Sequence, residues 1–391
     1  MNADVPRAPR RLLVVTDEME VGGSQRQIAH LLAGLDPRRW QAELLYFRTP
    51  SFLVGELEAR GIRTRHLPKR GRIDLRFLRR LHALLSQGRY DVVHAYSLTA
   101  ELWVRALLPL LPRTVFVASV RGLCLGYPWW QWRLKRAIAR RADAIIANSR
   151  AGARMTAQRA RVSLQRIDVI PNGVEIPAPI GPAARTHARA QLAIPEGRVF
   201  GLFVGRLVPE KNLPLLLDAM AQLPAVHRPL LLLAGDGQLR GALVERIGAL
   251  GLDADVRLIG ERRDAQALMQ FADFLVLPSR EEGLSNVLLE AMAAGCAALA
   301  SDAGGNPELV EHESSGLLFP SGDAPALARA LQRLCADEAL RARLGAQARA
   351  HAQSAHSLAA LVTTTEALYL RTLADGAAGA AAIGPAGTSH G

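Results

Sequence analysis

Residues 278–295 read PSREEGLSNVLLEAMAAG, and the rest of the chain can be understood outward from this stretch. It follows a short apolar run at Phe274–Leu277, which predicts a buried strand. Ser285 or Asn286 can cap the helix that begins next. A strand, a glycine-bearing turn and a helix N-terminus in succession favour a bound anion, because unpaired amides and the helix dipole both attract negative charge. The stretch therefore predicts a phosphate-binding turn.

Two carboxylates frame this turn. Glu282 lies before the helix, and Glu290 lies just over one turn inside it. From there, Glu290 can accept hydrogen bonds from two ribose hydroxyls while phosphates lie at the helix amides. Glu282 would then face the group that is attached beyond the phosphates. Two glutamates at this spacing also fit an ordinary amphipathic helix with acids on its surface. The residues around them must therefore distinguish a binding site from such a helix.

That context resembles the E-x7-E motif of the retaining, GT-B-fold glycosyltransferases of family 4, which use nucleotide-activated sugars. Ser279, Gly283 and Ala291–Gly295 match the surroundings of the motif. The resemblance covers nearly the whole chain and is densest at residues 205–319. It implies an α/β protein with two Rossmann-like domains, a cleft between them and a C-terminal helix that crosses back to the first domain. The implied activity is that of a bacterial hexosyltransferase in polysaccharide or glycolipid assembly.

The composition fits a globular protein of two or three domains. The chain has 391 residues, of which 49% are hydrophobic and 21% are charged. No stretch reaches the roughly 18 to 20 apolar residues of a membrane span. The apolar run at residues 12–15 is followed at once by acids and is too short for a signal peptide. Three scattered cysteines predict neither a disulfide framework nor a zinc site. We therefore expect a cytoplasmic protein.

The charge is distributed unevenly. Residues 1–172 carry 30 basic and 13 acidic side chains, whereas residues 173–391 carry 18 and 23. This asymmetry indicates two domains with different partners. A basic first half can face nucleic acid, an anionic membrane or a phosphorylated acceptor.

Short apolar runs alternate with helical periodicity through both halves, which predicts doubly wound parallel sheets. The Pro/Gly-rich segment 171–179 interrupts this alternation and is the best linker. We predict an N-terminal domain at 1–172, a C-terminal domain at 173–356, a returning helix at 357–373 and a disordered tail at 374–391. In such sheets, ligands lie outside the carboxyl ends of the strands. In the first half we predict strands at 12–16, 43–47, 91–95, 114–119, 144–147 and 167–170.

Four residues at strand ends in the first half are candidates for the site. Gly22 and Gly23 permit close backbone approach and unusual φ angles; the resembling family places such a pair near the donor phosphates, and a plain tight turn is the alternative. His94 can be a structural histidine or can line the cleft. Arg121 stands where many relatives carry a histidine that contacts the donor sugar. Because arginine stays charged and cannot act as a base, Arg121 can instead bind hydroxyls, phosphate or an acidic acceptor.

A stretch rich in tryptophan and cations follows Arg121. Aromatic rings at headgroup depth and cations facing anionic lipid would suit a membrane interface, here the inner membrane surface. The alternative is a core helix that buries Trp129 and Trp132 and leaves a solvated basic face. For the membrane contact, the residues concerned are Trp129, Trp130, Trp132, Arg133, Lys135 and Arg136.

In the second half, the segment from Gly205 to Asn212 matches the family element G-R-x-x-x-x-K-N. Transfer from a nucleotide sugar releases a diphosphate, and cations placed there lower the barrier directly. Arg206 can bind phosphate bidentately, and Lys211 can act as a compact point charge. Gly235 lies in a segment that matches the family's A-G-x-G.

These residues together predict the site. Glu282, Arg206 and Lys211 are the catalytic candidates, with His94 and Arg121 as further ones. The donor nucleotide would contact Gly22, Gly23, Gly235, Gly260, Ser285, Asn286, Val287 and Glu290. With two cations present, we expect no metal or other cofactor, and we interpret the D-x-D at residues 253–255 as a connecting loop. The resemblance implies front-face transfer from a nucleotide sugar to a saccharide or lipid-linked acceptor.

Two other functions stay open at this stage. A nucleotide-sugar epimerase would keep the fold, but it needs acid/base pairs of histidines and carboxylates that this chain does not clearly offer. A module that binds nucleic acid or another anionic surface would use the basic half and leave the donor site vestigial. We expect no nucleic-acid partner, because no motif for one is present.

Overall fold

A computed structural model of the chain describes residues 8–20, 22–71, 74–111 and 114–382. The chain divides into two compact units. Unit 1 consists of Met1–Gly173 and Leu358–Gly391, and unit 2 consists of Val174–Ser357. The division after Gly173 falls inside the predicted linker, one residue from the predicted boundary.

Unit 1 is built on a seven-stranded sheet with the strand order β3-β2-β1-β4-β5-β6-β7. All its strand pairs are parallel. Its elements are β1 (Arg10–Thr16), α1 (Gly23–Gly34), β2 (Trp40–Tyr46), α2 (Phe52–Ala59), β3 (Arg63–His66), α3 (Leu75–Gly88), β4 (Val92–Ala95), α4 (Leu98–Leu107), η1 (Leu108–Leu110), β5 (Val115–Val120), α5 (Trp129–Ala139), β6 (Ala144–Ala147), α6 (Arg150–Ala160), η2 (Leu164–Arg166), β7 (Ile167–Val169) and α15 (Leu358–Ala382).

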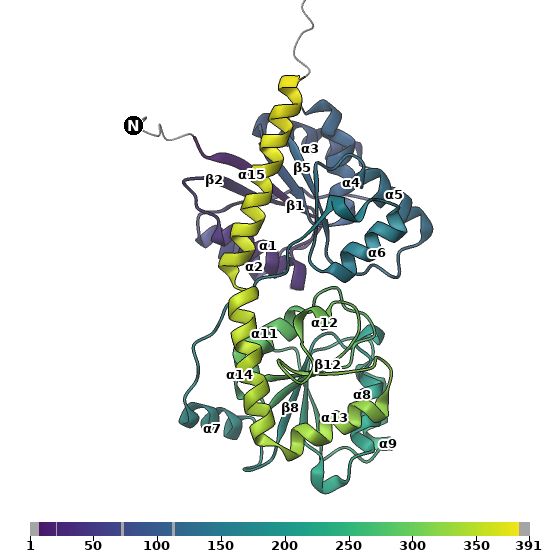
Figure 1. The fold of residues 1–391 in the computed structure, drawn as a ribbon. Helices are drawn as coiled ribbons and strands as arrows, with labels where there is room; N and C mark the ends of the chain where they lie inside the picture. The colour runs from purple at the N-terminus through teal and green to yellow at the C-terminus, as the bar shows by residue number, and fades with distance from the viewer. Residues whose placement is uncertain (1–7, 21, 72–73, 112–113, 383–391) are drawn as a thin grey trace, which may run out of the picture. The chain divides into compact units, whose positions relative to one another are not determined.

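The central strands of this sheet are apolar on both faces because helices cover both faces. Leu12 and Val14 of β1 belong to one core cluster, and Leu13 and Val15 belong to another. The last helix, α15, joins the first cluster and contacts α1, as Figure 1 shows in yellow. Trp40 donates from its ring nitrogen to Glu366 of α15 at 2.8 Å. The C-terminal helix is therefore an integral part of unit 1.

Unit 2 is built on a six-stranded parallel sheet with the order β10-β9-β8-β11-β12-β13. Its elements are α7 (Pro182–Gln191), β8 (Phe200–Val204), η3 (Pro209–Lys211), α8 (Leu213–Ala221), η4 (Ala225–His227), β9 (Leu230–Ala234), α9 (Arg240–Ala249), β10 (Val256–Gly260), α10 (Ala265–Phe271), β11 (Phe274–Leu277), α11 (Asn286–Ala294), β12 (Ala297–Ser301), α12 (Asn306–Leu309), β13 (Leu317–Phe319), α13 (Ala324–Ala336) and α14 (Glu338–Ala355).

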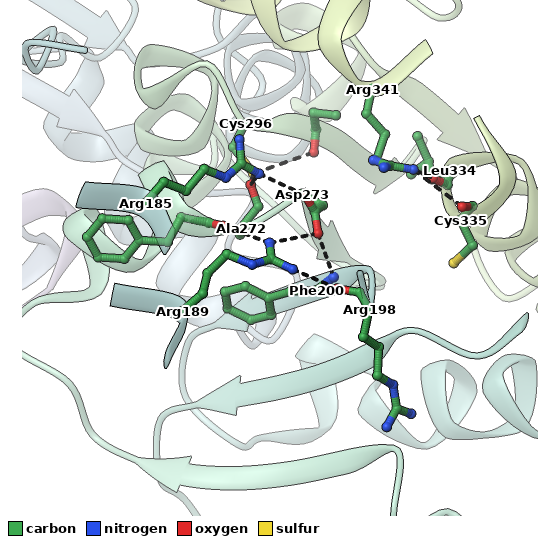
Figure 2. Close-up of polar contacts among 12 residues, drawn as sticks. Arg185, Arg189, Arg198, Phe200, Ala272, Asp273, Cys296, Leu334, Cys335 and Arg341 are labelled. Carbon is green, nitrogen blue, oxygen red and sulfur yellow. Dashed lines mark hydrogen bonds and ion pairs between the residues drawn. The ribbon is translucent and has the colours of Figure 1, made fainter. Parts of the chain in front are cut away.

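The helix α7 is held at the amino edge of the unit 2 sheet by a charged cluster around Asp273 (Figure 2). The Asp273 carboxylate accepts from Arg185 at 2.7 Å, from Arg189 at 3.0 Å and from the backbone amide of Phe200 at 2.7 Å. Asp273 precedes β11 and Phe200 opens β8, so this cluster ties the starts of two strands to α7. It lies at the edge opposite the strand ends where ligands are expected.

Two features differ from the sequence-based expectation. The edge strand β3, with the sequence RTRH, was not predicted, because it carries no apolar run or hydrophobic alternation. The last helix was predicted to end at residue 373 but continues to Ala382, since alanine, the best helix former, fills most of the segment despite Gly376 and Gly379. Residues 383–391 lie outside the described residues, so a disordered tail there stays a prediction.

Each sheet has one switch point, where the strand order reverses direction. In unit 1 this point lies between β1 and β4, and in unit 2 it lies between β8 and β11. Open α/β sheets bind their ligands outside the carboxyl ends of the strands at such points. The topology thus selects the same two edges as the predicted site residues.

Candidate functional site

The loops after β8 and β11 bring the predicted site residues of unit 2 together. Lys211 ends the short helix η3 after β8, and Glu282 lies in the turn between β11 and α11. Their side chains form an ion pair with 2.5 Å between Lys211 Nζ and Glu282 Oε1. The Ser279 hydroxyl donates to the same Oε1 atom at 2.7 Å. One cation and one carboxylate from different loops thus share a site at the switch point.

Backbone contacts hold these two loops in register. The Arg280 amide donates to the Glu210 carbonyl at 2.8 Å, and Gly305 after β12 donates to the Glu282 carbonyl at 3.1 Å. Ser301 donates from its hydroxyl to the Ser279 carbonyl at 2.6 Å. The position of Glu282 is therefore fixed by backbone hydrogen bonds from its neighbours as well as by its own side chain.

Glycine is required at Gly235, which directly follows β9. Its φ is +146°, and a Cβ atom there would lie 1.9 Å from the Gly205 carbonyl oxygen. Its amide donates to the Gly260 carbonyl at 2.7 Å. The loops after β8, β9 and β10 thus approach more closely than a side chain allows. This explains the A-G-x-G pattern in physical terms.

The helix α11 begins as the sequence predicts. The Ser285 hydroxyl accepts from the Leu288 amide at 3.3 Å, which caps the first turn. Asn286 and Val287 form that first turn, and Glu290 follows on the same helix, half-buried. Arg206, the other predicted phosphate ligand, is exposed directly after Gly205. Lys211, Glu282 and the start of α11 all come from the carboxyl edge of one sheet.

Unit 1 has a cavity of its own at its switch point. It measures about 400 Å³ and is lined by residues that follow β1, β4 and β5, with α5 and α1 contributing further side chains. Arg121 is its central cation, and the Arg121 guanidinium carbon lies 4.2 Å from the centre of the Tyr96 ring. The Nε and Nη1 atoms of Arg121 are buried and have no hydrogen-bond partner within the described part of the chain.

A buried ion pair between Glu101 and Lys135 lies beside this cavity. The sequence alone did not predict that these two residues would pair. Lys135 donates to both carboxylate oxygens of Glu101, at 2.6 and 2.7 Å, and to the Ser119 carbonyl at 2.7 Å. Glu101 also accepts from the Ser119 amide at 2.9 Å. The signal was available, because Glu101 falls among the buried positions Ala100 and Val104 of α4. A carboxylate at a buried position of a helix needs a buried partner, because burying an unpaired charge is costly.

His94 lies in the core of unit 1 and is fully buried. Its Nδ1 pairs with the Tyr369 hydroxyl at 2.6 Å, and its Nε2 pairs with the Ser119 hydroxyl at 2.7 Å. Burial, together with the charge of Arg121, holds the pKa of His94 well below its ordinary value. Both ring nitrogens are engaged within unit 1, so this geometry favours the structural interpretation of His94 over contact with a substrate.

The paired glycines have a plainer geometry than expected. Gly22 precedes α1 with a φ of −158°, an extended conformation that any residue can adopt, and Gly23 is the first residue of the helix. The expectation of an unusual φ is therefore wrong at Gly22.

The tryptophan-rich stretch divides between surface and core. Trp129 and Trp130 are 72% and 48% exposed, and Arg133 lies over the Trp129 ring at 5.8 Å. Trp132 and Lys135 are buried, so both must be removed from the predicted membrane-contact surface. The alternative, a core helix that buries Trp129 and Trp132, is confirmed for Trp132 and wrong for Trp129. The helix α5 faces the core with one side and presents two aromatic rings with the other.

The D-x-D segment serves a structural purpose. The Asp255 carboxylate forms ion pairs with Arg198 at 2.5 Å and with Arg228 at 3.3 Å. It lies between α9 and β10, where the sequence analysis placed a connecting loop.

The fold defines a two-unit α/β protein with parallel, doubly wound sheets, and comparison with known proteins gives its family. Residues 184–351 match the family described as "Glycosyl transferases group 1", and residues 21–176 match "Glycosyltransferase Family 4". The chain belongs to this family of GT-B glycosyltransferases. The predicted family, fold class and enzyme class are thereby confirmed.

Among its relatives is a D-inositol 3-phosphate glycosyltransferase of Xylanimonas cellulosilytica, which is 32% identical over 69% of this chain and 70% of that protein. A protein of the same name from Saccharomonospora viridis is 28% identical over 88% of this chain and 90% of that protein. The crystal structure of Anabaena HepE in complex with UDP-glucose superposes with a TM-score of 0.82 at 24% identity, covering 93% of this chain and 99% of that one.

Proposed function

We propose that this chain is a retaining glycosyltransferase that transfers a hexose from a nucleoside diphosphate sugar to a saccharide or lipid-linked acceptor. The observation that carries the proposal is the contact of Lys211 with Glu282 at the switch point of unit 2. The fold of unit 2 is shared with HepE, whose crystal structure contains UDP-glucose. We therefore take UDP-glucose as the first donor to test.

In this reaction, the bond between the anomeric carbon and the diphosphate oxygen breaks, and negative charge grows on the departing diphosphate. Arg206 and Lys211 would bind that charge, and the amides of Ser285, Asn286 and Val287 would add the positive end of the α11 dipole. Gly235 and Gly260 let backbone lie against the nucleotide. Gly22 and Gly23, which belong to unit 1, are proposed to approach the donor phosphates.

Glu282 would accept hydrogen bonds from hydroxyls of the donor sugar, and Glu290 from those of the ribose. Before the donor binds, Lys211 neutralises Glu282. Donor phosphates would draw Lys211 toward themselves and leave the Glu282 oxygens for the sugar. The pair is therefore a preformed site whose partners change when the substrate arrives.

The proposed mechanism is a front-face substitution. The acceptor hydroxyl attacks the anomeric carbon from the side on which the diphosphate departs, and its proton passes to the departing phosphate oxygen. The anomeric configuration is retained, and the enzyme forms no covalent intermediate. The chemistry proposed here uses Arg206 and Lys211 as its cations in place of a metal.

Unit 1 would hold the acceptor and contact the membrane. Its surface carries the two exposed rings of Trp129 and Trp130 beside Arg133, a combination that binds well at headgroup depth. Among the described residues, no helix has both the length and the hydrophobicity needed to cross a bilayer. We propose a cytoplasmic enzyme with peripheral contact at the inner membrane surface, mediated by Trp129, Trp130, Arg133 and the half-buried Arg136.

A panel of nucleotide sugars tests the donor assignment. At one hundred times its dissociation constant, a donor stabilises the protein by about 2.7 kcal/mol, which thermal unfolding detects readily. With the matching donor we expect slow release of nucleoside diphosphate, and with an acceptor a product of unchanged anomeric configuration by NMR. Inverted product would contradict the mechanism. Isotope exchange within the donor in the absence of an acceptor would instead indicate an epimerase.

A further inference from the structure

The cavity in unit 1 is lined by Arg121, whose guanidinium group is only partly satisfied by the residues that the structure describes. Two of its nitrogen atoms, Nε and Nη1, are buried and form no hydrogen bond with any described residue. A buried charged donor without an acceptor is costly, and such groups in native proteins are normally satisfied by a partner, an ion or a ligand. Arg121 borders the 400 Å³ cavity, so the partner can enter from there.

The other charges around the cavity do not satisfy Arg121. Lys135 also lines the cavity, but its ammonium is matched by Glu101. Asp17 lines it as well, yet among the described residues Asp17 and Arg121 form no ion pair. The remaining polar lining is mostly hydroxyl groups, including those of Ser97, Thr99 and Tyr127.

The Arg121 guanidinium is oriented by a stack of aromatic rings. Arg121 stacks on Tyr96, whose ring lies 4.4 Å from the ring of His94. His94 is in turn fixed by hydrogen bonds to Tyr369 and Ser119. A planar fork of donors that is oriented before binding is well suited to a carboxylate or phosphate, which it can bind bidentately.

The strand β5, which ends one residue before Arg121, is held by the buried ion pair of Glu101 and Lys135. The amide and the carbonyl of Ser119, two residues before Arg121, are bound by Glu101 and Lys135 respectively. The buried ion pair thus holds the end of β5 in place. Glu101 and Lys135 act as positioning residues for Arg121, at the strand end where ligands of open α/β sheets bind.

We infer that Arg121 binds an oxyanion of the acceptor, a phosphate or a carboxylate, and so restricts this enzyme to acidic acceptors. The inference rests on the proposed function, because it assigns this cavity to the acceptor. The hydroxyl-rich lining around Arg121 receives the sugar that carries the anion, and Asp17 accepts from its hydroxyls. An acceptor without the anion would leave the Arg121 nitrogens unsatisfied and would bind poorly.

Tryptophan fluorescence makes a direct test possible in the full-length chain. All five tryptophans lie between residues 40 and 132, in unit 1, and Trp132 lines the cavity. Glucose 6-phosphate, glucuronate, inorganic phosphate and glucose are titrated against the wild type without a donor. We expect the anionic sugars to bind, with glucose at least about 10-fold weaker. The stronger of glucose 6-phosphate and glucuronate identifies the class of acidic acceptor.

The variant Arg121→Gln should weaken binding of the anionic sugar by about 10- to 100-fold and abolish its advantage over glucose. Arg121→Lys should restore part of it. Arg159→Gln on α6, which removes an exposed arginine of the same unit, should leave binding unchanged. The inference is overturned if no anion binds the wild type, if glucose binds equally well, or if Arg121→Gln has no effect.

UDP binding is measured in the same variants to separate this inference from the proposed function. Arg121→Gln should bind UDP as the wild type does. If it binds UDP more weakly, the anion at Arg121 belongs to the donor, and the acceptor assignment is wrong. If wild type and variants all fail to bind any nucleotide, the proposed function is wrong. The titration with anionic sugars would then still show whether Arg121 binds an oxyanion.

Discussion

Lys211 and Glu282 lie 71 residues apart in the sequence, yet 2.5 Å separates the Lys211 ammonium from a Glu282 carboxylate oxygen. The pairing depends on β8 and β11, which are neighbours in the sheet although β9 and β10 intervene in the chain. Each residue follows the carboxyl end of its strand. The strand order therefore brings the cation proposed to bind the diphosphate beside the carboxylate proposed to bind the sugar.

Removing either partner should abolish most of the transfer. Lys211→Ala removes a preorganised cation, and we expect a loss of about 100- to 1,000-fold in kcat, the range found when one electrostatic contact to the transition state is removed. Glu282→Gln keeps the size of the side chain but loses the charge, and should lower transfer in a similar way. The rates are measured with the donor found in the nucleotide-sugar panel.

Glu281→Gln is the matched control, since it neutralises the adjacent acid of the same loop. It should keep nearly wild-type turnover. Turnover by Lys211→Ala or Glu282→Gln equal to that of Glu281→Gln would contradict the roles proposed for the pair.

A methyl group at Gly235 should disrupt the donor site. Gly235→Ala would place a Cβ atom 1.9 Å from the Gly205 carbonyl oxygen at a φ of +146°, so the two loops must separate. We expect lower stability of unit 2 and weaker nucleotide binding. Gly248→Ala on α9, where a Cβ would meet nothing within 4 Å, should instead stabilise by up to about 1 kcal/mol. Calorimetric unfolding and UDP titration distinguish the two, and equal effects would refute the steric argument.

Breaking the buried ion pair should destabilise unit 1. Lys135→Met leaves the Glu101 carboxylate buried without its cation, which typically costs about 3–5 kcal/mol. Adding Glu101→Gln removes that unpaired charge while retaining an acceptor for the Ser119 amide. The double variant should therefore be more stable than the sum of the single effects predicts. Urea unfolding followed by tryptophan emission reports unit 1, and strict additivity would show that the pair does not interact.

The stability of unit 1 should depend on pH through His94. Its pKa is held well below 6.5 by burial, whereas unfolding exposes the imidazole and returns the pKa to its ordinary value. As the pH falls through about 6.5, the unfolded state binds a proton that the folded state resists, so stability falls by up to about 1.4 kcal/mol per pH unit.

Comparing the slopes of variants isolates this effect. His94→Gln should flatten the dependence of unit 1 stability on pH, and His82→Gln on α3 should leave it as in the wild type. If the free energy of unfolding of His94→Gln changes with pH as steeply as that of the wild type, other groups cause the pH dependence. Tryptophan-monitored urea unfolding above and below about pH 6.5 provides the data.

The exposed rings of α5 should contribute to membrane binding. Trp129→Ser and Trp130→Ser together remove rings that are 72% and 48% exposed, and should weaken binding to vesicles containing anionic lipid. Leu164→Ser, at a residue that is 48% exposed elsewhere in unit 1, is the matched control. Vesicle sedimentation measures the difference. Equal binding by the control and the double variant would exclude this surface as the contact.

The sequence by itself determined the local parts of this protein. Short, continuous apolar runs between the helical segments predicted most strands. A strand of a parallel sheet is buried on both faces, so nearly all its side chains are apolar. The helix start at Ser285 and the glycine at Gly235 were readable for a similar reason, since capping and tight backbone contact impose particular residue types. The edge strand β3 was not readable, because an exposed edge imposes no hydrophobic pattern.

Only the tertiary structure decided which polar residues meet. His94 and Arg121 both lie near the end of a strand pattern in the sequence, yet His94 is enclosed by Tyr369 from the last helix while Arg121 borders a cavity. Lys135 looked like a surface cation until Glu101, 34 residues earlier, was found beside it. Local sequence specifies the strand or helix and the face a residue occupies. Whether a charge there is paired, buried or open to a ligand depends on which distant segment packs against it.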